Sequence, residues 1–178
     1  MISEALFLGG RSGVGKTRVG LAVHALLSTA RVRHALIEGD NLDQAYPSPA
    51  EQGLAERNLA AMWTNYRSLG YRRLVYTNTA SVFPRVIEEL TAAMGDRPSV
   101  TAVLLTCDDQ TARARLAQRE NGVELARHLE RSILMARALS TAVSGRTHVV
   151  DTIGRSPEEI AAQVIGLTGW RPDPPMLG

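Results

Sequence analysis

The fold is decided by the stretch Gly10-Arg11-Ser12-Gly13-Val14-Gly15-Lys16-Thr17. It matches the pattern G-x-x-x-x-G-K-[ST], in which glycines let successive backbone N–H groups turn inward around phosphate oxygens. The apolar run Ala5 to Gly9 before it predicts a strand, and the pattern Lys16 to Ser28 predicts a helix. A strand, this loop and a helix N-terminus together form an anion cradle. The sequence therefore predicts a nucleotide phosphate site at Gly10 to Thr17.

Within this loop we expect the Lys16 ammonium to bridge the β- and γ-phosphates of ATP and the Thr17 hydroxyl to ligate Mg²⁺. Lys16 is the only lysine in the 178-residue chain, since every other basic residue is an arginine. The alternative is an ordinary glycine-rich turn with an incidental lysine, which the flanking strand and helix argue against. We therefore expect ATP and Mg²⁺ as cofactors, with Lys16 as a catalytic residue.

Short apolar runs alternate with helical patterns along the rest of the chain. The predicted strands are Ala5 to Gly9, Val32 to Glu38, Arg73 to Tyr76, Val100 to Thr106 and Thr147 to Asp151. The predicted helices are Lys16 to Ser28, Glu51 to Leu69, Pro84 to Met94, Asp108 to Gln118, Val123 to Ala142 and Pro157 to Leu167. This alternation predicts a three-layer α/β fold with a five-stranded parallel sheet. Ligands in such folds bind beyond the carboxyl ends of the strands.

Composition narrows the class of protein further. The formal charge of +2 comes from 20 basic and 18 acidic residues spread along the chain, without a basic run typical of nucleic-acid binding. We find neither a secretory signal pattern nor a membrane-spanning apolar stretch, and the single cysteine, Cys107, suits a reducing compartment. We expect one domain over residues 1–170, an extended or disordered tail over 171–178, a cytoplasmic location, and no nucleic-acid or membrane partner. Oligomeric state stays open.

A pair of carboxylates follows the second predicted strand, in the segment Glu38-Gly39-Asp40-Asn41. A carboxylate beside the phosphate loop can accept a hydroxyl proton or steer a Mg²⁺-bound water. The alternative is that Asp40 and Asn41 only cap a turn, because both residue types favour turns.

This segment resembles the D-G-D-N segment of adenylyl-sulfate kinases. It is also similar to acidic segments of shikimate kinases, gluconate kinases and chloramphenicol phosphotransferases. The resemblance implies that Asp40 contacts the acceptor hydroxyl or the metal, with Glu38 as its partner. It leaves open whether Asp40 is a general base or a metal ligand. The expected metal ligands are therefore Thr17, Glu38 and Asp40, and Asp40 is also an expected catalytic and substrate residue.

The segment after the fourth predicted strand contains Arg115-Leu116-Ala117-Gln118-Arg119, which matches R-L-x-x-R. It resembles the stretch that leads into the lid of the nucleoside-monophosphate-kinase group. The resemblance implies that Arg115 lies against the adenine and that Arg119, as a catalytic residue, reaches the phosphates. Guanidinium groups suit both tasks, because they stack on aromatic planes and offer a rigid donor fork to phosphate.

Arg127 and Arg131 repeat the same spacing, and Arg127 is a substrate candidate. Ion pairs with Glu124 and Glu130 on a solvated helix surface explain the two arginines equally well. The buried stripe of that helix would then consist of Ala126, Leu129, Ile133 and Ala136.

In the resembled kinases the helices after the second strand wall the acceptor pocket, which makes Arg57 and Asn58 substrate candidates. An equal alternative is a solvated helix face, with Leu54, Met62 and Leu69 directed toward the core.

The third predicted strand runs into Val75-Tyr76-Thr77-Asn78-Thr79 and lacks the acid that most resembled kinases place near that strand end to hold Mg²⁺. Thr77 and Asn78 are candidates for orienting water or the acceptor, and the alternative is that they simply begin the loop. At the last predicted strand, Thr152 and Gly154 occupy the position of the adenine loop in the resembled fold, which implies a role in cofactor binding.

These motifs and resemblances imply a P-loop kinase with a short arginine-bearing lid, which moves the γ-phosphate of ATP to a hydroxyl of a small-molecule acceptor. The acceptor class includes antibiotics and nucleoside-like metabolites, because antibiotic phosphotransferases share this size and plan. A switch-type nucleotide-binding protein would need a base-specific motif such as N-K-x-D, and Lys16 is the only lysine. A nucleotide-dependent protein that sequesters a ligand stays open, because the missing third-strand acid fits weak catalysis.

Overall fold

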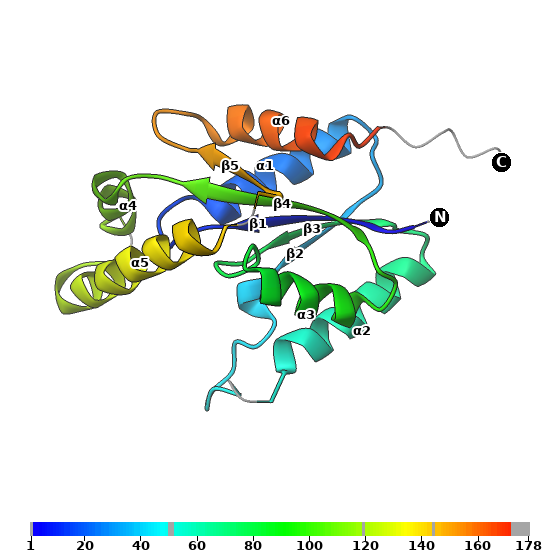
Figure 1. The fold of residues 1–178 in the computed structure, drawn as a ribbon, viewed down its shortest axis with the longest axis horizontal. Helices are drawn as coiled ribbons and strands as arrows, with labels where there is room; N and C mark the ends of the chain where they lie inside the picture. The colour runs from blue at the N-terminus through cyan, green and yellow to red at the C-terminus, as the bar shows by residue number, and fades with distance from the viewer. Residues whose placement is uncertain (1, 50–51, 119, 144, 172–178) are drawn as a thin grey trace.

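The computed structural model describes residues 2–49, 52–118, 120–143 and 145–171 (Figure 1). In this part of the chain, one five-stranded parallel sheet has the strand order β2-β3-β1-β4-β5. The strands are β1 (Glu4–Gly9), β2 (Ala35–Glu38), β3 (Arg73–Thr77), β4 (Ser99–Thr106) and β5 (Thr147–Asp151). The predicted parallel sheet is confirmed. The phosphate loop follows β1, which lies at the centre of the sheet.

Helices cover both faces of the sheet, as predicted. They are α1 (Lys16–Thr29), α2 (Leu54–Ser68), α3 (Pro84–Met94), α4 (Asp109–Leu116), α5 (Gly122–Ala142) and α6 (Pro157–Thr168), with a short 3₁₀ helix, η1 (Gly39–Asn41). Figure 1 shows α1 and α6 on one face, α2 and α3 on the other, and α4 with most of α5 beyond the carboxyl ends of the strands.

The central strand divides its side chains between two apolar cores. Leu6 and Leu8 point into the core on the side of α1 and α6, whereas Ala5 and Phe7 point into the core on the side of α2 and α3. Each fully buried leucine or phenylalanine stabilises the fold by about 1.5–3 kcal/mol relative to an exposed one. Burial on both faces explains why β1 is a continuous apolar run rather than an alternating one.

The bounds of α2, β2 and α4 differ from the sequence prediction by two or three residues, and those of the other elements by at most one. Helix α2 begins at Leu54 rather than Glu51, because Gly53 before it adopts a positive φ of 58°. Strand β2 begins at Ala35 rather than Val32, because the chain turns after α1 and the Val32 N–H donates to the Leu27 carbonyl oxygen at 2.9 Å.

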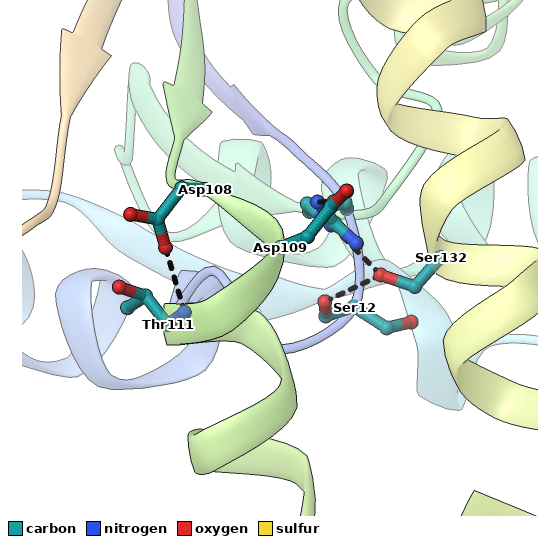
Figure 2. A network of polar contacts seen from close by, with 6 residues as sticks. Ser12, Asp108, Asp109, Thr111 and Ser132 are labelled. Atoms are coloured by element: carbon teal, nitrogen blue, oxygen red, sulfur yellow. Dashed lines mark hydrogen bonds and ion pairs between the residues drawn. The ribbon is translucent and has the colours of Figure 1, made fainter. Parts of the chain in front are cut away.

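Helix α4 spans Asp109–Leu116 rather than Asp108 to Gln118, because Asp108 is its cap. The Asp108 carboxylate accepts a 2.6 Å hydrogen bond from the Thr111 N–H, as Figure 2 shows.

The buried faces of two helices also differ from the prediction. On α5, Ser132 and Leu139 are buried and Ala126 is exposed, whereas the other three predicted stripe residues are half-buried. Ala126 faces solvent because the N-terminal half of α5 extends beyond the sheet (Figure 1). After α2, Leu69 is 68% exposed, because it lies in the turn that follows the helix.

Trp170 is buried against the core beside α1 and α6, at the end of the predicted domain. Of the predicted tail, residues 172–178 lie outside the described residues. Within the described ranges, none of the helices combines the length and the apolar character that crossing a membrane requires.

Candidate active site

The phosphate loop has a backbone that requires glycine at defined positions. Gly10, Gly13 and Gly15 have positive φ angles of 148°, 84° and 104°. Space is also limiting, because a Cβ on Gly10 would lie 2.7 Å from the Leu105 carbonyl oxygen, and one on Gly13 2.8 Å from that of Ala112. Glycine thus permits the tight loop that leads into the N-terminus of α1, and a loop of this kind is suited to binding phosphate.

The Lys16 ammonium lies across this loop. Its Nζ donates to the Gly10 carbonyl oxygen at 2.9 Å and to that of Arg11 at 3.4 Å. Burial lowers the pKa of Lys16, while the nearby Asp40 and Glu38 carboxylates raise it. The charge is therefore held in a partly desolvated position, where contact with a phosphate oxygen is stronger than in water.

A cavity of about 300 Å³ lies against the loop. Its lining includes Ser12 to Val19, together with Asp40, Arg115 and Thr152. This volume is at the lower end of the range of small-molecule sites. The structure therefore brings part of the predicted phosphate loop to one cavity with Asp40 of the predicted acceptor side and with Arg115 and Thr152 of the predicted adenine side.

Thr17 and Glu38 meet at the edge of this site. The Thr17 hydroxyl lies 3.3 Å from Glu38 Oε2, and the buried Glu38 Oε1 has no hydrogen-bond partner among the described residues. A buried carboxylate oxygen without a partner is costly, and a hard cation would satisfy it. No group of three or more His, Cys, Asp or Glu in the described ranges forms a metal cage. Mg²⁺ needs none, because it commonly takes one or two carboxylates together with substrate phosphates.

Asp40 lies on η1, exposed, and lines the cavity. Its Oδ1 accepts a 2.7 Å hydrogen bond from Asn78 Nδ2 at the end of β3. A Cβ on Gly39 would overlap the Tyr76 hydroxyl and lie 3.0 Å from the Asn78 Cβ. Glycine at position 39 therefore permits the close approach of η1 to β3 that joins Asp40 to Asn78.

Arg115 braces the phosphate loop against the segment after β5. Its Nη1 donates to the Val14 carbonyl oxygen at 2.9 Å and to Thr152 Oγ1 at 3.0 Å, and its Nη2 donates to the Thr152 carbonyl oxygen at 3.0 Å. The guanidinium plane is thus fixed at the cavity wall. Gly154, by contrast, is exposed and does not line the cavity.

Solved structures with this architecture include a tunicamycin resistance protein of Deinococcus radiodurans, with a TM-score of 0.65 at 20% identity over 97% of this chain and 99% of that chain. A gluconokinase of Sinorhizobium meliloti 1021 has a TM-score of 0.61 at 18% identity, over 94% of this chain and 92% of that chain. A shikimate kinase of Acinetobacter baumannii has a TM-score of 0.57 at 16% identity, over 93% and 92%. The fold is that of the P-loop kinases. No protein-family model and no curated protein matches the sequence.

In this P-loop kinase fold the Arg11 side chain points away from the cavity. It is 4% exposed, forms an ion pair with Asp109, and donates from Nε to Ser132 Oγ at 2.9 Å. The Ser132 hydroxyl of α5 in turn donates to the Ser12 carbonyl oxygen at 2.9 Å, as Figure 2 shows. The Arg11 side chain thus supports the loop from behind, and Arg11 does not line the cavity. Sequence reasoning missed Asp109 and Ser132, which are 98 and 121 residues away from Arg11.

The remaining predicted residues are dispersed. Arg119 lies outside the described residues. Arg57 and Arg127 are exposed and do not line the cavity. Asn58 Nδ2 donates to the Leu42 carbonyl oxygen at 2.6 Å, so this side chain anchors the segment between η1 and α2.

Sequence reasoning also missed a pair of side chains beyond α4 at the cavity wall. Glu120 and His128 both line the cavity, and His128 Nδ1 lies 2.8 Å from Glu120 Oε1. The pair joins the segment after α4 to α5. Glu120 lies before α5 and His128 lies within it. Helical periodicity therefore gives no sign in the sequence that these two side chains meet.

Proposed function

We propose that this chain transfers the γ-phosphate of ATP to a hydroxyl of a small molecule. The observation that carries the proposal is the cavity in which the loop lysine, Lys16, faces a second-strand carboxylate, Asp40. A phosphate cradle alone binds nucleotide, whereas a carboxylate across the same cavity adds a group that can receive or steer a proton. A cytoplasmic location, where ATP is available, is part of the proposal.

In the proposed complex the loop N–H groups and Lys16 hold the phosphates of ATP, and the fixed Arg115 guanidinium lies beside the adenine. Thr17 and Glu38 are the residues that would hold Mg²⁺, which would supply positive charge to offset the negative charge of the transferring group. Arg119 stays a predicted phosphate contact.

The transfer joins the acceptor oxygen to the γ-phosphorus and breaks the bond to the β–γ bridging oxygen, so that ADP leaves. Asp40 receives or steers the proton of the acceptor hydroxyl. The protein contributes mainly alignment of the two reactants and fixed charge, which are the principal sources of catalysis in phosphoryl transfer. We propose an antibiotic or a nucleoside-like compound as the acceptor, and the likeness to a tunicamycin resistance protein favours the antibiotic class.

The second candidate function is nucleotide-dependent sequestration of a ligand. The observation that favours it is the end of β3, where Asn78 stands instead of an acid.

Mass spectrometry separates the two functions. The protein is incubated with ATP, Mg²⁺ and a panel of hydroxyl-bearing antibiotics and nucleosides, and Lys16→Ala is run in parallel. We expect one acceptor to gain one phosphate as ADP forms, and we expect the variant to bind an ATP analogue much more weakly in calorimetry. Retention of an unmodified ligand only when ATP is present would favour sequestration. Equal ATP affinity of the variant would contradict the phosphate site itself.

A further inference from the structure

Asn78 stands at the end of β3, directly beside the phosphate loop. Its backbone N–H donates to the Leu8 carbonyl oxygen at 3.2 Å, and the Gly10 N–H donates to the Thr79 carbonyl oxygen at 3.2 Å. The segment that carries Asn78 is therefore bonded to the residues before and after Gly9, the last residue of β1. These two backbone hydrogen bonds fix the position from which the Asn78 side chain extends.

The side-chain amide of Asn78 has a defined orientation. Its Oδ1 accepts from the Ala80 N–H at 2.8 Å, and its Nδ2 donates to Asp40 Oδ1 at 2.7 Å. Because the oxygen is the only acceptor of the amide, the Ala80 N–H determines which end faces Asp40. The end directed at Asp40 is the donor, which has no lone pair to offer a cation.

The two carboxylates of the site have different partners. Glu38 Oε2 lies beside the Thr17 hydroxyl at 3.3 Å, and Glu38 Oε1 is buried without a partner among the described residues. Asp40 Oδ1 accepts the hydrogen bond from Asn78. The other carboxylate oxygen of Asp40 makes no hydrogen bond to the described residues. The hydroxyl and the unpaired buried oxygen, which suit a cation, are thus on the Glu38 side of the site.

We propose that Asn78 is a positioning residue, which holds the Asp40 carboxylate toward the acceptor hydroxyl, and that β3 contributes no metal ligand. This inference rests on the proposed function, because it assigns Asp40 to the acceptor. It also gives the end of β3 a role in catalysis, although the residue there is not an acid. The asparagine replaces a metal-binding acid with a hydrogen-bond donor.

The close approach of η1 and β3 supports the same assignment. Tyr76 is 3% exposed, and its hydroxyl lies against Gly39. Burial, together with the nearby Asp40, Glu56 and Asp43 carboxylates, raises the pKa of Tyr76, so its phenol stays neutral beside Asp40. Tyr76 therefore adds no charge beside Asp40, and Asn78, whose Nδ2 donates to Asp40 Oδ1, adds none either.

The variant Asn78→Asp distinguishes a positioning residue from a degenerate metal ligand. It keeps an oxygen for the Ala80 N–H but sets a second carboxylate against Asp40. We expect the rate of ADP formation from Mg·ATP, with water or an accepted hydroxyl, to fall by about 10²-fold, within the range of a displaced general base. We expect the Mg²⁺ concentration that gives half-maximal binding of an ATP analogue not to decrease. Asn65→Asp on the exposed surface of α2 adds the same charge away from the site and should leave both values unchanged.

Exchanging the two residues tests the contact itself. Asn78→Asp should lower the melting temperature, because like charges face each other. The double variant Asp40→Asn with Asn78→Asp should restore it, because the amide and carboxylate are still paired, with exchanged positions. Turnover should not return, since the anion is then on β3. Turnover restored together with stability would show that the reaction does not need the anion at position 40, and that result would overturn the positioning role.

Two outcomes separate failure of this inference from failure of the proposed function. Tighter Mg²⁺ dependence or higher turnover in Asn78→Asp would make position 78 a metal site, and the positioning role would be wrong while the kinase assignment stood. An unsubstituted protein that binds Mg·ATP but forms no phosphorylated product and no ADP would contradict the proposed function. The inference would be contradicted with it, because Asp40 would then have no acceptor to serve.

Discussion

Glu38 and Asp40 are two positions apart in the chain, yet their side chains have different partners in the site. Glu38 lies beside the Thr17 hydroxyl, whereas Asp40 is held by Asn78. At the scale of single residues, we propose that the acidic pair at the end of β2 divides into a metal side, Glu38, and an acceptor side, Asp40. Substitutions that keep the shape and remove the charge should separate the two roles.

We predict that Asp40→Asn retains Mg·ATP binding and loses phosphoryl transfer by about 10²–10⁴-fold, the usual contribution of a general base. Glu38→Gln should lose transfer in a way that raised Mg²⁺ partly restores, because the amide oxygen still offers one neutral ligand. Coupled ADP-release assays over a Mg²⁺ series measure both variants. If raised Mg²⁺ restores Asp40→Asn instead, Asp40 is a metal ligand and the two assignments must be exchanged.

The φ of Gly39 is not in the left-handed region that favours glycine, so backbone conformation does not require a glycine there. Limited space beside Tyr76 does. Gly39→Ala places a Cβ in overlap with the Tyr76 hydroxyl, so we predict destabilisation of about 1–3 kcal/mol, as for other overpacked sites. Displacement of η1 should also lower turnover, because Asp40 moves away from Asn78.

Urea unfolding measures the loss for Gly39→Ala, and Gly166→Ala is its control. Gly166 lies within α6, and a Cβ there would meet nothing within 4 Å. Its replacement should be neutral or stabilise the helix by up to about 1 kcal/mol. Equal unfolding free energies for the two variants would show that η1 yields to the extra methyl group.

At the scale of elements, α5 is fastened to the phosphate loop by one hydroxyl. Ser132 accepts from the buried Arg11 and donates to the Ser12 carbonyl oxygen. We predict that Ser132→Ala lowers the free energy of unfolding by about 1–3 kcal/mol, because it leaves a buried donor and an acceptor unpaired. The affinity for an ATP analogue should fall as well, since the loop loses its support.

Asp109→Asn is the matched comparison for Ser132→Ala. The Asp109 side chain is 65% exposed, so its ion pair with Arg11 is screened by solvent, and we expect a change below about 1 kcal/mol. Chemical unfolding and calorimetric titration rank the two variants. A larger loss in Asp109→Asn would mean that the carboxylate of α4, rather than the neutral hydroxyl of α5, is the main support of the loop.

The elements themselves were largely predictable from the sequence, whereas their contacts were not. Continuous apolar runs such as β1 identify strands buried on both faces, and Ser156 with Glu159 forms a capping box at the start of α6. The start of α2 was mispredicted, because its periodicity does not reveal that Gly53 adopts a positive φ. The Arg11–Ser132 contact joins residues 121 positions apart, and a local pattern carries no information about such a pair.

At the scale of the whole molecule, stability should depend on pH through His34. This residue is 8% exposed, its Nδ1 lies 2.7 Å from the Val32 carbonyl oxygen, and its Nε2 lies 2.8 Å from His24 Nδ1. Burial lowers the pKa of His34. The hydrogen bond with Val32 acts in the opposite direction, and the nearby His24 and Arg73 lower the pKa further. The folded protein therefore binds this proton less readily than the unfolded chain.

It follows that the contribution of His34 is complete above about pH 6.5, the unperturbed value, and is lost as the pH falls toward the lowered pKa. We predict a urea midpoint that decreases below that pH, with a weaker decrease in His34→Gln. His148→Gln on the exposed face of β5 is the control and should keep the slope of the unsubstituted protein. If the urea midpoint of His34→Gln decreased as steeply as that of the unsubstituted protein, groups other than His34 would be responsible for the acid sensitivity.

The lone lysine has a practical consequence. Because Lys16 is the only lysine and lines the cavity, an acylating reagent directed at amines finds a single side-chain target, and that target lies in the proposed phosphate site. Any compound that covers the loop should shield this one position, and the unmodified fraction of a single peptide then reports occupancy. The protein thus contains its own reporter for ligand screening, which requires neither an engineered tag nor an acceptor of known identity.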